Sequence, residues 1–354
     1  MASATTPVPD PKKMKYVRLG NSGLKVSKLI LGCMSYGSPE WTGQSWILPE
    51  EVGIEHIKFA YDAGINAFDT AAIYSDGQSE EILGKAIKQH NIPRDEIVVM
   101  TKITFRYAPW KKRSEADGGR STNQYGLSRK HIFDSVRDSL KRLQLEYIDL
   151  LQCHRFDYDT PIEETMQALH DVVKAGYVRY IGMSSCWAYQ FHIMQNYAIT
   201  HNLTPFISMQ NHHNVVYREE EREMFPTLKH FGVGIIPWSP LARGTVTRPL
   251  AAQKGGESKT DRGSGDPLIG VYENGGFSPI VQRVEEVAGK RGVSMAQVAL
   301  AWSMKKDGIT APVIGSTSTA KLADCIAAVS LQLTDEEMKY LEEPYLPVPV
   351  WGHA

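Results

Sequence analysis

Four polar residues in the first half of the chain have types and positions suited to proton transfer at a carbonyl group. They are Asp69, Tyr74, Lys102 and His154. The phenol of tyrosine has an ordinary pKa of about 10, which is too high for easy proton loss at neutral pH. A lysine ammonium beside Tyr74 would lower that pKa, and a carboxylate beside the lysine would keep the lysine charged. We therefore expect Asp69 and Lys102 to pair and to tune Tyr74.

A neutral histidine would complete this set, because the His154 imidazole could donate a hydrogen bond to a carbonyl oxygen and orient it. The four side chains together suit delivery of a proton to a carbonyl oxygen while hydride arrives at the carbon. Three of them also have an ordinary explanation: Asp69 could cap a helix, Lys102 could be a solvated charge, and His154 could be a hydrogen-bonded core residue. Only their joint arrangement favours catalysis.

Short apolar runs alternate with longer amphipathic patterns along the chain. The run at 97–100 is brief and β-branched, which is typical of a buried strand. Ser128 then suits a helix cap, and Ile132, Val136 and Leu143 recur on one helical face with Leu140. The expected strands are 27–31, 67–69, 97–100, 147–153, 180–184, 208–210, 234–237 and 312–315.

Eight strand–helix steps predict a (β/α)8 TIM barrel, an α/β fold in which crossover helices join parallel strands. We expect a single domain over residues 1–354, with 1–14 as a flexible tail. The segment 16–24, which contains Gly20, predicts a hairpin that plugs the base of the barrel. An open, doubly wound sheet is the competing architecture.

Polar residues, together with one tryptophan and one glycine, occur where the expected strands end. In a barrel these ends converge on one face. An open sheet would not bring them all together, so their number favours the barrel. These residues are Asp69, Lys102, His154, Ser184, Gln210, Trp238 and Gly315.

Composition sets limits on the partners and the compartment. The chain has 39 basic and 40 acidic residues and a formal net charge of -1, so nothing favours nucleic acid or an anionic membrane. Its four cysteines contain no CxxC pair, which indicates a reducing compartment. No apolar run has the length of a signal peptide core or a membrane span. We expect a cytoplasmic protein that acts on a small molecule.

The segment 68–74 (FDTAAIY) resembles the signature of the aldo-keto reductase superfamily, with the same spacing from Asp69 to Tyr74. Thr101-Lys102 and a later Gln-x-His match in order, and the resemblance extends from Tyr16 to about Val329. The segments 209–214 (MQNHHN) and 217–221 (YREEE) are most similar to the fungal aryl-alcohol-dehydrogenase-like branch.

This resemblance implies NADPH-dependent reduction of an aldehyde or ketone to the alcohol. It makes Tyr74 the acid/base, Lys102 and Asp69 its tuning pair, and His154 the residue that positions the substrate carbonyl. Potassium-channel β-subunits, which resemble the same superfamily and bind NADP(H) with little turnover, are the alternative. They carry asparagine where this chain has His154, which favours a working reductase.

The family binds extended NADP(H) across the barrel mouth, and no GxGxxG follows a strand to support a Rossmann-type site. The resemblance assigns Ser184, Ser185 and Gln210 to the nicotinamide amide, with Asp69 also at the cofactor. It assigns the ring stacking and pyrophosphate contacts to Trp238, Ser239, Pro240, Leu241, Ala242, Arg243 and Gly244.

The resemblance places the adenosine 2′-phosphate at the start of the helix that follows the eighth strand, where free backbone N–H groups also favour anions. This site comprises Gly315, Ser316, Thr317, Lys321 and Arg248. The chain departs from the common family pattern at Ser185, Ser318 and Asp324-Cys325, and Lys321 and Arg248 are the substitute cations. We expect NADP(H) rather than NAD(H).

A barrel metallohydrolase is a further alternative that the residues disfavour, and we expect no metal. His212 and His213 are adjacent rather than spaced, and neighbours on a strand point to opposite faces. The substrate depends on loops, here 34–46, 106–123 and the segment 344–354. These loops contain the aromatic residues Trp41, Trp46, Tyr107, Trp110 and Trp351, which favours an aromatic or bulky carbonyl substrate. The glycine-rich segment 250–277 is either a lid over the cofactor or a surface insertion.

Overall fold

The structure is a computed structural model that describes residues 6–41, 45–104, 123–254, 266, 269–272 and 276–353. The expected loop 106–123 therefore lies almost entirely outside the described residues, and the segment 250–277 is described only in part. Tyr107 and Trp110 also lie outside the described residues.

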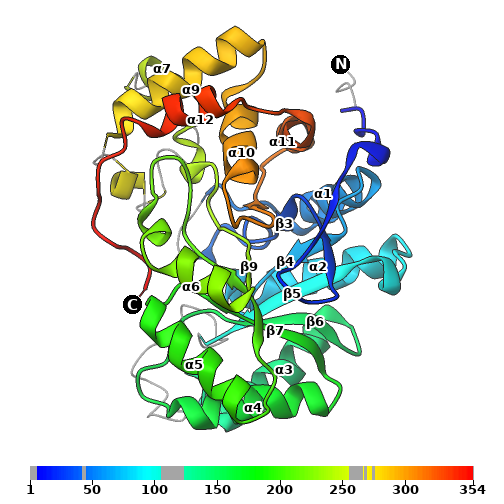
Figure 1. Ribbon diagram of the computed structural model, residues 1–354. Coiled ribbons are helices and arrows are strands. Elements are labelled where there is room, and N and C mark those ends of the chain that lie inside the picture. The colour runs from blue at the N-terminus through cyan, green and yellow to red at the C-terminus, as the bar shows by residue number, and fades with distance from the viewer. Residues whose placement is uncertain are drawn as a thin grey trace.

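Eight parallel strands form one sheet that curls into a barrel (Figure 1). The order of the strands is β10-β3-β4-β5-β6-β7-β8-β9, and the backbone N–H of Val313 donates to the Pro237 carbonyl at 2.9 Å across the two ends of that order. The (β/α)8 barrel predicted from the sequence is thus confirmed. The strands are β3 (Ile30–Gly32), β4 (Ala67–Asp69), β5 (Val98–Ile103), β6 (Ile148–Cys153), β7 (Val178–Ser184), β8 (Phe206–Gln210), β9 (Gly234–Ile235) and β10 (Val313–Ile314).

Helices surround the sheet, and their buried faces follow from the spacing of apolar residues (Figure 1). Ser128 caps α3 by accepting from the His131 N–H, as the sequence predicts, and Ile132 and Val136 are fully buried on its inner face. The helices are α1 (Glu50–Asp62), α2 (Gln78–Gln89), α3 (Arg129–Leu143), α4 (Ile162–Lys174), α5 (Ala188–Thr200), α6 (Met224–Phe231), α7 (Leu250–Lys254), α9 (Phe277–Arg291), α10 (Met295–Lys305), α11 (Thr319–Ala327) and α12 (Asp335–Glu342).

An antiparallel hairpin precedes the barrel and consists of β1 (Tyr16–Arg18) and β2 (Lys25–Ser27). Leu19 and Val26 from this hairpin are fully buried in one cluster with Met100 and Leu150 of the barrel strands, which agrees with the predicted plug. One boundary was wrong: Ser27 belongs to the hairpin, and the first barrel strand begins at Ile30.

Part of the expected N-terminal tail packs against the protein. Asp10 caps a short 3-10 helix at Pro11–Lys13, and Met14 is buried in the core cluster between sheet and helices. A Cβ atom on Gly64 would lie 2.9 Å from the Met14 side chain, so this contact is close. Residues 11–14 therefore do not form the flexible tail that we expected for 1–14.

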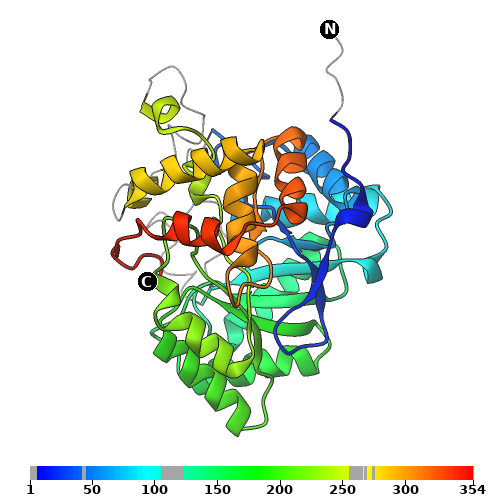
Figure 2. The same ribbon diagram turned by 45° about the horizontal axis from the view of Figure 1, so that its top comes forward.

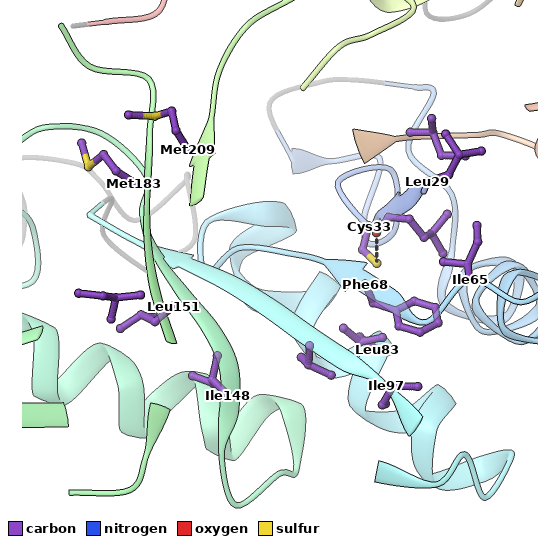
Figure 3. Packing of buried hydrophobic residues seen from close by; sticks show 14 of the residues in the cluster. Leu29, Cys33, Ile65, Phe68, Leu83, Ile97, Ile148, Leu151, Met183 and Met209 are labelled. Atoms are coloured by element: carbon purple, nitrogen blue, oxygen red, sulfur yellow. Dashed lines mark hydrogen bonds between the residues drawn. The ribbon is translucent and has the colours of Figure 1, made fainter. Parts of the chain in front are cut away.

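The larger core lies between the outer face of the barrel and its helices (Figure 3). Phe68 from β4, Leu83 from α2 and Leu151 from β6 are buried there. The Cys33 thiol points into the same layer and donates to the Leu31 carbonyl at 3.9 Å. Because apolar groups fill this layer, the polar residues at the strand ends are held on a rigid frame.

The C-terminal segment returns from α12 to the barrel (Figure 2). The Tyr345 hydroxyl donates to Glu219 at 2.6 Å, and the backbone N–H of Val348 donates to the same carboxylate at 3.1 Å. The Trp351 N–H donates to the Tyr217 hydroxyl at 2.9 Å. These bonds fix the last residues of the chain against the loop that follows β8.

Candidate active site

Asp69, Tyr74, Lys102 and His154 meet at the carboxyl ends of neighbouring strands, as expected. Asp69 is the last residue of β4, Lys102 lies near the end of β5, and His154 directly follows β6. Tyr74 begins the short 3-10 helix after β4. A cavity of about 810 Å³ opens at this face, and Asp69, Tyr74 and His154 line it. Its size is typical of a small-molecule or cofactor site.

Lys102 is fully buried and bridges the carboxylate and the phenol. Its Nζ atom lies 2.5 Å from Asp69 Oδ2, 2.9 Å from the Thr70 carbonyl oxygen and 3.3 Å from Tyr74 Oη. Burial by itself lowers the pKa of Lys102, but the nearby Asp69 and Tyr74 oxygens outweigh it, so that the pKa is raised. The lysine is therefore charged, because the buried carboxylate compensates its charge.

The pKa of Tyr74 moves in the direction opposite to the one that we predicted. Burial raises this pKa, Lys102 lowers it, Asp69 raises it again, and the net pKa lies above the ordinary value. The expectation of a net lowering neglected the loss of water around the phenol, which disfavours the phenolate. Tyr74 is consequently protonated at neutral pH and is able to donate a proton.

His154 is neutral, as predicted. Burial lowers its pKa well below the ordinary value, and the positive charges of Arg155 and Lys102 add to this effect. Its ring is nearly perpendicular to that of Tyr74, at 87° with 5.8 Å between the ring centroids. A neutral imidazole carries one N–H donor, so Tyr74 and His154 can both donate to one substrate oxygen between them.

Two glutamines hold the Asp69 carboxylate, and sequence reasoning identified only one of them. The side-chain amides of Gln152 and Gln210 each donate to Asp69 Oδ1 at 2.9 Å. Gln210 also donates to the Gln152 side-chain oxygen at 3.0 Å. Gln152 could have been identified from the alternation of side chains along a strand, which puts it on the same face as His154.

The residues expected at a nicotinamide amide are only partly free to bind one. Ser184 and Gln210 line the cavity, and the Ser184 hydroxyl donates to the Gln210 carbonyl at 2.8 Å. Ser185 instead accepts from the indole N–H of Trp238 at 3.0 Å. Ser185 therefore orients Trp238, and Ser184 and Gln210 remain at the cavity wall.

Trp238 forms one wall of the cavity and is part of an aromatic stack. The His212 ring stacks on Trp238 with 4.1 Å between the ring centroids. Tyr217 also stacks on His212, with 4.0 Å between their centroids. His212 Nε2 lies 2.7 Å from the Tyr272 hydroxyl oxygen, and the Trp351 and Trp238 rings meet edge to face with 5.7 Å between their centroids. The stack keeps the Trp238 ring in place.

The segment after β9 has a strained backbone. Ser239, Ala242, Arg243 and Gly244 all have positive φ angles, at 52°, 46°, 57° and 92°. Such conformations are costly for residues other than glycine and are typical of functional loops, where successive N–H groups form anion-binding concavities. Ala242 is buried, whereas the cavity wall contains Ser239, Pro240, Leu241, Arg243, Gly244 and Arg248.

The far end of the same cavity is formed by the start of α11. Ser318 caps this helix, and Lys321 lies in its first turn with its Nζ atom 3.0 Å from the Thr317 hydroxyl. Asp324 accepts from Ser294 at 2.7 Å and from the Gln297 amide at 2.6 Å. The cavity residues in this region are Gly315, Ser316, Thr317, Lys321, Asp324 and Cys325.

Aromatic residues from the expected substrate loops lie near the four polar residues. Trp46 and Trp351 line the cavity, and the Trp41 ring lies 6.3 Å from that of Tyr74. Arg155 also lines it, although sequence reasoning did not select it. Within the described residues, no three His, Cys, Asp or Glu side chains are grouped to hold a metal ion. The arrangement can deliver a proton to an oxygen held by Tyr74 and His154.

Comparisons with known proteins agree with this geometry. A family model described as Aldo/keto reductase family matches residues 28–345. The chain is 48% identical over 340 residues to the versiconal hemiacetal acetate reductase of Aspergillus parasiticus, an alignment that covers 94% of this chain and 98% of that protein. It is 50% identical over 349 residues to a protein of Schizosaccharomyces pombe named as a candidate aryl-alcohol dehydrogenase, covering 95% and 97% of the two chains. An aldo-keto reductase of Alternaria alternata is 46% identical over 353 residues, covering 96% and 94%.

Proposed function

The chain belongs to the aldo/keto reductase family, and from this premise we propose that it reduces an aldehyde or ketone to the alcohol with NADPH. Tyr74 donates the proton in this proposal. The single observation that carries it is the contact of the protonated Tyr74 phenol with buried Lys102, at 3.3 Å. A charged lysine at this distance stabilises the phenolate that proton donation leaves behind.

The residues of the cavity fit a nicotinamide dinucleotide. Its wall runs from Asp69 and Trp238 to Lys321 at the start of α11, so one elongated ligand could contact both ends. The positive-φ segment that contains Arg243 and the N-terminus of α11 both present backbone N–H groups suited to phosphates. When bound, the reduced cofactor would supply hydride to the carbonyl carbon. Lys321 and Arg248 are the cations that favour NADPH over NADH.

The residues of the chain position and protonate the carbonyl. His154, neutral because of its burial, donates to the carbonyl oxygen and orients it. Tyr74 transfers its phenolic proton to that oxygen, and Lys102, paired with Asp69, stabilises the resulting phenolate. The apolar faces of Trp46 and Trp351 in the cavity wall exclude water and favour an aromatic or bulky substrate. The name of the Schizosaccharomyces pombe relative refers to aryl alcohols, which supports this substrate class.

A substrate screen tests the proposal. Purified protein would be mixed with NADPH and a panel of aromatic and aliphatic aldehydes and ketones, and NADPH consumption would be followed by its absorbance. We expect turnover of aromatic aldehydes, with a higher kcat/KM for NADPH than for NADH. Tight NADPH binding without turnover of any carbonyl would instead indicate a binding protein that resembles the potassium-channel β-subunits.

A further inference from the structure

Arg155 directly follows His154 and lines the same cavity, but none of the steps above uses it. Its guanidinium Nη1 atom donates to the His154 carbonyl oxygen at 2.6 Å. Burial lowers the pKa of Arg155, and no carboxylate of the described residues opposes that effect, since the groups that act on it in the other direction are Tyr74 and Cys186. An arginine has five N–H donors, so this contact uses a small part of its capacity.

Three other arginines that are buried or partly buried each have an acidic partner. Arg142 pairs with Glu80 at 2.6 Å, and Arg243 pairs with Asp266 at 2.5 Å. Arg94 pairs with Asp149 at 2.5 Å. A charge removed from water is destabilising unless an opposite charge and hydrogen bonds compensate it. Arg155 therefore differs from these residues in lacking a carboxylate within the described part of the chain.

The guanidinium of Arg155 lies between the reacting residues and the C-terminal segment. Its positive charge lowers the pKa of both Tyr74 and His154. Arg155 is therefore near both groups that would hold the carbonyl oxygen. On the other side, a Cβ atom placed on Gly352 would lie 4.0 Å from Arg155 Nη2 and 3.5 Å from the Trp238 ring. Gly352 has a φ of 93°, and Trp351 beside it lines the cavity.

We propose that Arg155 determines specificity by binding a carboxylate of the substrate, so that the preferred substrates are aldehydes or ketones that also carry a carboxylate. This inference rests on the proposed function. The planar guanidinium matches a carboxylate in a two-pronged contact, and the bound anion supplies the partner that the protein does not. Because Arg155 and His154 both line the cavity, a single small molecule can contact both. The phosphates of the cofactor have their own cations, Arg248 and Lys321, elsewhere on the cavity wall.

The test compares two substrates that differ in one charge, 4-formylbenzoate and its methyl ester. We expect the wild-type protein to have a kcat/KM at least about tenfold higher for 4-formylbenzoate. The Arg155→Met variant keeps the length of the side chain and removes the charge, and it should lower kcat/KM for 4-formylbenzoate by about 10- to 100-fold, the usual effect of losing a charged hydrogen bond. Its kcat/KM for the methyl ester should fall much less, so that the preference for 4-formylbenzoate over the ester drops by about tenfold or more. Arg155→Lys should restore part of the preference, since it keeps the charge but not the planar fork.

Arg137→Met removes a charge from the exposed face of α3 and serves as the matched control, with both substrates unaffected. Binding of benzoate and of benzamide, measured by titration calorimetry with NADPH present, provides a readout that does not need turnover. Arg155-dependent binding of benzoate but not of benzamide supports the inference even if no carbonyl is reduced. Equal losses for both substrates in Arg155→Met, or benzoate binding that does not depend on Arg155, would overturn it while leaving the reductase proposal intact.

Discussion

The Lys102 ammonium lies 3.3 Å from the Tyr74 phenol oxygen, and this contact opposes the effect of burial on the phenol. Burial prevails in the resting protein, so that the phenol keeps its proton. Lys102 stays charged because Asp69 lies 2.5 Å away. The pair thus holds a proton donor beside a positive charge that stabilises the donor once the proton has left.

Replacement of Tyr74 by phenylalanine removes the proton donor and little else. We expect Tyr74→Phe to lower kcat for carbonyl reduction by about 100- to 10,000-fold, the usual contribution of general acid catalysis. The dissociation constant for NADPH, followed by fluorescence titration, should change by less than about threefold. Tyr158→Phe, at a 60% exposed position, is the matched control. Turnover at the wild-type rate in Tyr74→Phe would exclude this role.

The raised pKa of Tyr74 predicts opposite pH dependences for the two directions of the reaction. Reduction needs the protonated phenol, which predominates below the raised pKa, so kcat/KM should be flat from about pH 6 to 9. His154 stays neutral over this range, because its pKa is lowered. Alcohol oxidation needs the phenolate and should rise about tenfold per pH unit below that pKa. A tenfold fall per unit in the reduction rate above neutral pH would mean that Lys102 outweighs burial.

Gln152 should contribute to stability through its hydrogen bond to Asp69. Gln152→Met removes one of the two amide donors to Asp69 Oδ1 and leaves the Gln210 amide without its Gln152 acceptor. We expect the free energy of unfolding, measured with urea, to fall by about 1–3 kcal/mol. Gln89→Met, on the exposed end of α2, should leave stability within about 0.5 kcal/mol of the wild-type value. Similar values for the two variants would contradict the assigned contact.

His353 should affect the substrate more than the cofactor, because it fixes the segment that carries Trp351. His353 Nε2 lies 2.6 Å from Glu220 Oε1, and both side chains are buried. His353→Ala is expected to raise the KM for an aromatic aldehyde by about 3- to 30-fold, which corresponds to one lost charged hydrogen bond. Val350→Ala, at a 42% exposed position of the same segment, is the control. An unchanged KM in His353→Ala would show that this anchor does not shape the substrate site.

Lys321 should distinguish the two nicotinamide cofactors. It lies in the first turn of α11, where a 2′-phosphate is proposed to bind, and it is exposed at the cavity rim. We expect Lys321→Ala to raise the KM for NADPH by about 3- to 10-fold, because the lost charge acts on a partly solvated phosphate, and to leave the KM for NADH unchanged. Lys88→Ala, on the exposed face of α2, is the control. Equal changes for both cofactors would remove Lys321 from phosphate recognition.

Much of the fold was predictable because local pattern and barrel geometry agree. Apolar residues recur on one face of α3, and Ser128 caps this helix at the position that the sequence predicts. The apolar pattern was less accurate at strand ends: the run at 97–100 covers only part of β5, whose polar residues Thr101 and Lys102 also pair with β6. The strand ends at Ile103, one residue beyond the expected end at Lys102. A polar strand end carries no apolar signal, although backbone pairing continues through it.

The sequence by itself determined which residues gather at the mouth of the barrel. Asp69, Lys102 and His154 stand at or near successive strand ends, and parallel strands bring such positions to one face whatever the details of packing. The spacing from Asp69 to Tyr74 then brings the phenol into the same group. The gathering of these four residues therefore depends only on their order in the chain and on the two-residue alternation of side chains along each strand.

Only the tertiary structure decided how these residues are charged and held. The Gln210 amide binds Asp69 across 141 positions of sequence, and the burial that raises the pKa of Tyr74 comes from several elements at once. The lack of an acidic partner for Arg155 likewise depends on every side chain around it. Desolvation and long-range hydrogen bonds depend on the whole surrounding volume, and a local stretch of sequence does not specify that volume.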